Sequence, residues 1–85
     1  MSVSEAGDIK QLAATTTADD INFVRSVSRV YLKTTADVYI AFDRAATTAD
    51  FLLASTDGIT EFDVTCTYVS VKAATTATVY AIGSR

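Results

Sequence analysis

Residues 30–43 read Val30-Tyr-Leu-Lys-Thr-Thr-Ala-Asp-Val-Tyr-Ile-Ala-Phe-Asp43, and this stretch decides the fold class. On both sides of a polar break at residues 34–37, the even positions hold Val30, Leu32, Val38, Ile40 and Phe42. Because successive side chains of a β-strand point to opposite faces, each half presents one apolar face. The stretch predicts strands at 30–33 and 38–43 that pair as a hairpin, although it lacks the Asn-Gly or Asp-Gly pair typical of tight hairpins.

The second half of the chain repeats this plan. Apolar side chains fall at even positions from Phe62 to Tyr68 and at odd positions from Val69 to Val71. One extra residue in a strand reverses the facing of all that follow, so the shift predicts a β-bulge. Residues 73–76 then separate strands at 68–72 and 77–82, which we expect to form a second hairpin.

The remaining segments complete an all-β domain. Residues 8–12 and 21–27 add one or two strands, and Asp57-Gly58 predicts a turn that brings Leu52 and Ile59 to the ends of adjacent strands. Turns every 8–12 residues are typical of sandwiches and barrels. We therefore predict a small antiparallel β-sandwich or barrel of six to eight short strands over residues 8–85. Residues 1–7 are predicted to be a flexible leader, or an arm that orders on a neighbouring subunit.

The motif Thr-Thr-Ala-Asp recurs at residues 16–19, 34–37 and 47–50, and a fourth copy at 75–78 ends in Thr78. The copies start 18, 13 and 28 residues apart, which is too irregular for a solenoid with one fixed period. We interpret them as turns and loops between strands. If these loops gather at one end of the domain, their threonine and aspartate side chains form a polar rim where a partner could bind.

Composition limits the classes of function. The chain has 85 residues, seven of them basic, and a net charge of −3, which disfavours a nucleic-acid partner because phosphate binding depends on clustered Lys and Arg. The single cysteine excludes a disulfide within the chain, so association is the expected source of added stability. The chain has neither the basic and apolar regions of a secretory signal nor a long apolar run, which predicts a soluble protein made inside a cell, with no membrane partner.

Catalytic chemistry is predicted to be absent. The chain has no histidine, which removes the usual general base and the histidine-containing triads and zinc sites. Its three glycines form no phosphate-binding loop. Cys66 alternates with apolar residues and is predicted to be an inert core residue. The carboxylates of Asp57, Glu61 and Asp63 do not have calcium-loop spacing and are interpreted as solvated. We predict no enzyme activity, no cofactor and no metal.

Basic and tyrosine side chains supply the candidate interface. Arg25, Arg29 and Lys33 fall at odd positions, so on one continuous strand they would share a face with Tyr31; this face is either a basic stripe for a partner or an ordinary solvent-facing strand. Tyrosine is enriched in interface cores, although cross-strand pairing would also account for the tyrosines. The candidate interface residues are Tyr31, Tyr39, Tyr80, Arg25 and Arg29.

The layout from about residue 20 to 83 resembles that of small β-rich virion proteins of tailed bacteriophages. The segments that carry the resemblance are 30–33, 38–43, 51–53 and 77–82. It implies a capsid decoration or cement protein, made in the host cytoplasm and located in the virion. Such a protein binds the major capsid protein, or another virion protein, as a homo-oligomer, with a trimer favoured. The alternatives are a tail or head-tail attachment component, or a receptor- or carbohydrate-binding β module.

Overall fold

The computed structural model describes residues 9–84, which form eight β-strands and one short 3-10 helix. The predicted leader at residues 1–7 lies outside this range. The elements are β1 (Ile9–Ala14), β2 (Asp19–Val27), β3 (Arg29–Thr34), β4 (Val38–Phe42), β5 (Phe51–Leu53), η1 (Ser55–Asp57), β6 (Thr60–Phe62), β7 (Cys66–Ala73) and β8 (Ala77–Ser84).

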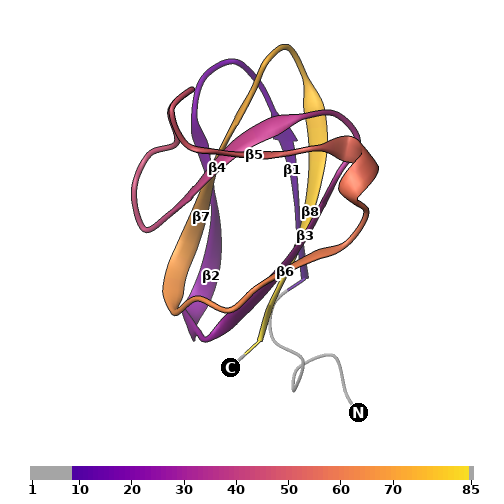
Figure 1. The fold of residues 1–85 in the computed structure, drawn as a ribbon. Helices are drawn as coiled ribbons and strands as arrows, with labels where there is room; N and C mark the ends of the chain where they lie inside the picture. The colour runs from indigo at the N-terminus through magenta and orange to yellow at the C-terminus, as the bar shows by residue number, and fades with distance from the viewer. Residues whose placement is uncertain (1–8, 85) are drawn as a thin grey trace.

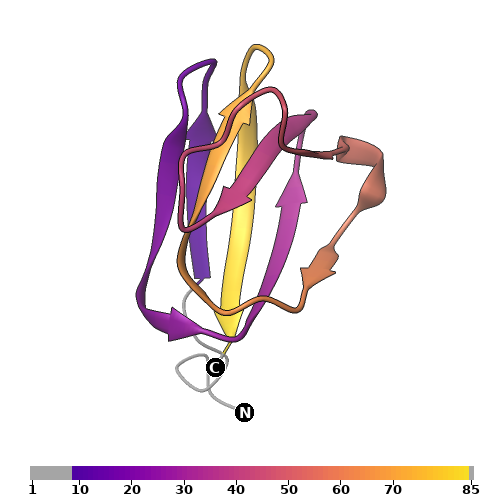
Figure 2. The same ribbon diagram turned by 60° about the vertical axis from the view of Figure 1, so that its left-hand side comes forward.

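The strands form two antiparallel sheets packed face to face (Figures 1 and 2). Sheet A has the order β1-β8-β3-β6, and sheet B has the order β2-β7-β4-β5. The prediction of a small all-β antiparallel fold is confirmed, and of the two architectures it allowed the chain adopts the sandwich. Eight strands in two sheets with this order have the connectivity of a jelly roll.

The predicted hairpin between residues 30–33 and 38–43 is wrong. Strand β3 pairs with β8 and β6 in sheet A, whereas β4 pairs with β7 and β5 in sheet B. The break at 34–37 is an arch that carries the chain from one sheet to the other. Within it, the Thr34 hydroxyl donates to the carbonyl oxygen of Ala36 at 2.6 Å. Alternation could not distinguish the two arrangements, because in both of them the even side chains face the core.

The second predicted hairpin is wrong for the same reason, since β7 lies in sheet B and β8 in sheet A. The turn at Gly58 has the expected positive φ of 67°, but it joins β5 and β6 of different sheets. Residues 61–72 are likewise two strands, β6 and β7, and not one. The change of phase is present in β7, since Cys66 is buried and so are Val69 and Val71. The register shift against β2, however, places the extra residues in β2, between Asn22 and Val27, and not in β7.

The core lies between the sheets and is made of small and branched side chains. Its fully buried members come from both sheets and include Val30, Leu32, Val38, Ile40, Leu53, Val69, Val71 and Val79. Cys66 is buried among them, as predicted. Burial, with a smaller effect of Asp43, raises the pKa of the Cys66 thiol to about 11, so it is a neutral apolar side chain at pH 7.

Candidate functional site

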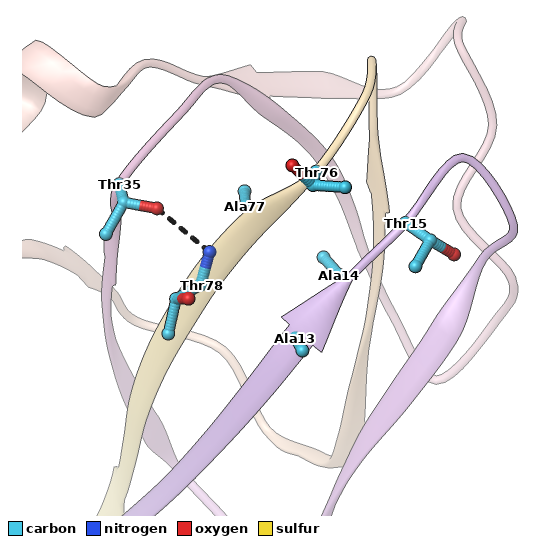
Figure 3. Close-up of a pocket in the computed structure, with 7 residues that line it drawn as sticks. All are labelled: Ala13, Ala14, Thr15, Thr35, Thr76, Ala77 and Thr78. Carbon is cyan, nitrogen blue, oxygen red and sulfur yellow. Dashed lines mark hydrogen bonds between the residues drawn. The ribbon is translucent and has the colours of Figure 1, made fainter.

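Three of the four threonine-rich loops meet at one end of the sandwich. They are the connections β1–β2, β3–β4 and β7–β8, which lie together in Figures 1 and 2. They surround a cavity of about 240 Å³, here called the end pocket (Figure 3). Its lining residues are Ala13, Ala14, Thr15, Thr35, Thr76, Ala77 and Thr78. The prediction that the loops with the recurrent motif lie at one end of the domain is therefore confirmed for three of the four copies.

Backbone and hydroxyl hydrogen bonds hold these loops together. Thr35 donates its N–H to the carbonyl oxygen of Thr78 at 3.0 Å, and the N–H of Thr78 donates to Oγ1 of Thr35 at 2.9 Å (Figure 3). The β3–β4 connection is thus tied to the start of β8, the strand beside β3 in sheet A. The end pocket has room because two residues of its lining, Ala14 and Ala77, have small side chains. They are opposite each other in the β1–β8 register.

The end pocket offers hydroxyl and methyl groups, and none of its lining residues within 9–84 has a titratable side chain. Pockets that enclose small ligands have volumes of about 300–1,000 Å³, so this one is small for a cofactor. The remaining copy of the motif, at 47–50, lies at the opposite end of β4. Strand β4 runs away from the arch at 35–37, and residues 47–50 follow its far end. The polar rim is therefore built from three loops and not from four.

A second candidate surface lies on the outer face of sheet A. Four apolar or aromatic side chains, from β3, β8 and the residue before β6, line a shallow groove of about 100 Å³ together with Leu32 and Lys33. We call these four the sheet A patch: Tyr31, Ile59, Tyr80 and Ile82. Ile59 is 70% exposed and Tyr80 is 43% exposed. A contiguous patch of exposed large apolar side chains is typical of an interaction surface.

The strand register brings the patch together. Tyr31 is opposite Ile82, and Lys33 is opposite Tyr80. Charged groups surround the patch: the Arg29 Nε atom lies 3.0 Å from Oε2 of Glu61 across the β3–β6 pair. Both of these side chains are about half exposed, so the ion pair contributes little to stability and mainly orients the two charges at the rim.

The outer face of sheet B is partly covered by the chain itself. The 43–50 loop folds over it, so that Ala46 is only 4% exposed and its N–H donates to Oγ of the buried Ser70 at 2.9 Å. Within residues 9–84, no segment covers the sheet A patch in this way. The two outer faces therefore differ, and sheet A carries the open one.

The structure divides the predicted interface residues between two faces. Tyr31, Tyr80 and Arg29 lie on the outer face of sheet A, whereas Tyr39 lies on sheet B opposite Lys72 and Leu52. Arg25 does not share a face with Arg29 and Lys33, because the chain changes sheet at Ser28 and Arg25 belongs to β2. Ile59 and Ile82 were not predicted; the exposure of Ile59 follows from its position just after Gly58, outside β6.

Two aspartates fix the 43–50 loop, Asp43 and the last residue of the Thr-Thr-Ala-Asp copy at 47–50. Asp43 has a positive φ of 57°, which aspartate tolerates better than most residues, and its carboxylate accepts the N–H groups of Thr67 at 2.8 Å and Tyr68 at 3.2 Å. Asp50 accepts from Arg44 Nη1 at 2.9 Å and from the N–H of Thr47 at 2.7 Å. The loop that covers sheet B is thus anchored at both ends.

Because of these contacts, the stability of the fold depends on pH. The N–H of Thr67 lowers the pKa of Asp43, and Arg44 together with Thr47 lowers the pKa of Asp50. Unfolded aspartate has a pKa of about 3.9, so the stabilisation is fully present above that value and is lost as the pH falls towards the lower folded pKa. We expect the thermal midpoint to decrease below about pH 4.

The same thermal measurement on the Asp43→Asn variant should give a lower midpoint at neutral pH and a weaker dependence on acid. Asp63→Asn is the control, since Asp63 is exposed and accepts no hydrogen bond from the described residues. An acid dependence of Asp43→Asn equal to that of the native protein would contradict the role of Asp43.

The described residues contain no group of three or more His, Cys, Asp or Glu side chains that could hold a metal ion. Nor does residue range 9–84 include a helix of the length and apolarity needed to cross a membrane. Comparison with protein-family models and with curated proteins finds no match to this chain.

Proposed function

We propose that this chain is a non-enzymatic structural protein of a bacteriophage virion, made in the host cytoplasm, that decorates or cements the capsid. The observation that carries the proposal is the sheet A patch, an apolar surface on the uncovered face of the sandwich. Ile59 and Tyr80 would enter an apolar recess of the major capsid protein, or of another virion protein. The exposed charges of Arg29, Lys33 and Glu61 would form the polar rim that interfaces have around such a core.

The jelly-roll connectivity is compatible with this role, because the fold occurs in viral capsid domains. Fold alone does not assign function, and jelly rolls also occur in lectins. The two tyrosines beside the sheet A groove favour a carbohydrate-binding module as the second candidate, since a tyrosine ring can pack on a sugar while its hydroxyl hydrogen-bonds. The two functions require different partners for the same patch.

Cosedimentation with capsids of the phage that carries this gene tests the proposal. We expect the native chain to bind stoichiometrically, and Tyr80→Ala or Ile59→Asp to weaken binding at least about tenfold, which is ~1.4 kcal/mol. Tyr39→Ala is the matched control, because it removes a tyrosine from the outer face of the opposite sheet. We expect this variant to bind like the native chain.

Two results would count against the capsid role. One is equal binding by the native chain and both sheet A variants, which would remove the patch from the interface. The other is binding of the isolated chain to a glycan array, with loss of that binding in Tyr80→Ala and no binding to capsids. That outcome would favour the carbohydrate-binding module instead.

A further inference from the structure

The sheet A patch and the end pocket lie next to each other on one face of the sandwich. In β8, buried residues alternate with outward-facing ones, and the outward-facing Tyr80 and Thr78 are two residues apart. Tyr80 lines the groove of the patch, and Thr78 lines the end pocket. On the neighbouring strand, Lys33 lines the groove and Thr35, just past the end of β3, lines the end pocket. Two strand residues span about 7 Å, so the two hollows are neighbours.

Each hollow has the size of a side chain and not of a whole ligand. The groove has a volume of about 100 Å³ and the end pocket about 240 Å³, both below the range of roughly 300–1,000 Å³ for pockets that enclose small molecules. The groove is mainly apolar. The end pocket offers hydroxyl and methyl groups, so it accepts a small uncharged side chain and would disfavour an unpaired charge. The face therefore suits side chains of a partner protein.

Lys33 supplies a positive charge between the two hollows. Its side chain is exposed and it is opposite Tyr80 in the β3–β8 register. Within residues 9–84, no carboxylate lies at ion-pair distance from Lys33, whereas Arg29 is paired with Glu61. Asp37, in the arch after β3, and Asp57, in η1, already accept backbone N–H groups at 3.0 Å and 3.1 Å. The described part of the chain thus leaves the Lys33 charge for a partner.

We propose that Lys33 and the end pocket belong to the same interface as the sheet A patch, and that they bind an acidic segment of the virion partner. This segment places an apolar side chain in the groove, a carboxylate at Lys33 and a small uncharged side chain in the end pocket. The inference rests on the proposed function, because it takes the patch to bind a virion protein. A partner that covers Tyr80 would exclude water from the Lys33 pair, which strengthens the attraction and rejects segments with a cation at that place.

The charge is tested by cosedimentation of the full-length chain with capsids. Lys33→Glu should weaken binding at least about tenfold, since like charges then meet. Arg25→Glu is the matched control, because it makes the same change of charge at an exposed position of β2, in the other sheet, and it should bind like the native chain. Raising the ionic strength from about 0.05 M to about 0.5 M should weaken native binding more than binding of Lys33→Met.

The end pocket is tested by filling it. Ala13 is exposed and opposite Thr78, so the larger side chain of Ala13→Leu would occupy part of the end pocket without entering the core. We expect this variant to bind capsids at least about tenfold more weakly. Ala45→Leu is the matched control, since it makes the same change at an exposed position of the 43–50 loop, which covers sheet B. Thermal unfolding should show native-like midpoints for both variants.

The outcomes separate this inference from the capsid role. Weak binding by Tyr80→Ala together with native-like binding by Ala13→Leu or by Lys33→Glu would overturn the extended interface and leave the capsid role in place. Equal salt dependence of the native chain and Lys33→Met would also overturn it. Failure of the native chain to bind capsids would overturn both proposals. If native mass measurement shows self-association that Lys33→Glu abolishes, a second copy occupies the face and the inference is wrong.

Discussion

We expect Leu53→Ala to lower the free energy of unfolding by about 2–5 kcal/mol, the range found for buried leucines. Leu53 is fully buried and is opposite Val38, which is also fully buried. Alanine would remove apolar contacts and leave a cavity that the surrounding strands can fill only in part. A domain of this size is stabilised by roughly 0.05–0.15 kcal/mol per residue, so this loss is a large fraction of the whole.

Urea unfolding followed by circular dichroism measures this effect, and Leu52→Ala provides its control. Leu52 is the preceding residue of β5, but its side chain is 46% exposed on the outer side. We expect Leu52→Ala to change the free energy of unfolding of the monomer by no more than about 0.5 kcal/mol. Equal losses for the two variants would contradict the placement of Leu53 in the core.

The second large effect is expected at Gly83, where Gly83→Ala should lower the free energy of unfolding by about 1–3 kcal/mol through overpacking. Gly83 lies in β8 opposite Val30, on the core-facing side. A Cβ atom at this position would lie 2.8 Å from Cδ1 of Phe23 and 2.8 Å from Cγ1 of Val27. Both neighbours are buried, so they cannot move into solvent to make room.

Thermal unfolding of Gly83→Ala and of Ser84→Ala tests this close contact, because Ser84 is the next residue and is only partly buried. A double variant identifies the cause. Val27→Ala removes one of the atoms that the new methyl group meets, so its combination with Gly83→Ala should be less destabilising than the sum of the single changes. Strict additivity would show that contact with Val27 is not the source of the loss.

The strands themselves were largely predictable from local sequence. The alternation at residues 30–42 marked β3 and β4 closely. The phase change near Tyr68 marked the place of a register shift between β2 and β7, but not that the extra residues lie in β2. The pairing of these strands was not predictable. A hairpin and an arch both place Leu32 and Ile40 in the core, and they differ only in whether the two strands exchange hydrogen bonds.

The candidate sites were predictable only in part. Tyr31 and Tyr80 were recognised as surface tyrosines, but their proximity depends on the pairing of β3 with β8, which lie far apart in the sequence. Isoleucine is usually buried, so the residue type of Ile59 predicts a core position and not an exposed one. Asp43 and Asp50 resemble any loop aspartates, and their roles appear only when their hydrogen-bond partners are known.

The sequence by itself determined that the chain is all-β, where most of its turns fall and that Cys66 is buried. These properties follow from the side-chain period of a strand and from local backbone preferences, which neighbouring residues encode. Only the tertiary structure decided which sheet each strand joins and which outer face stays open. Those properties depend on hydrogen bonds and packing between distant segments, and the same alternating pattern is compatible with several such arrangements.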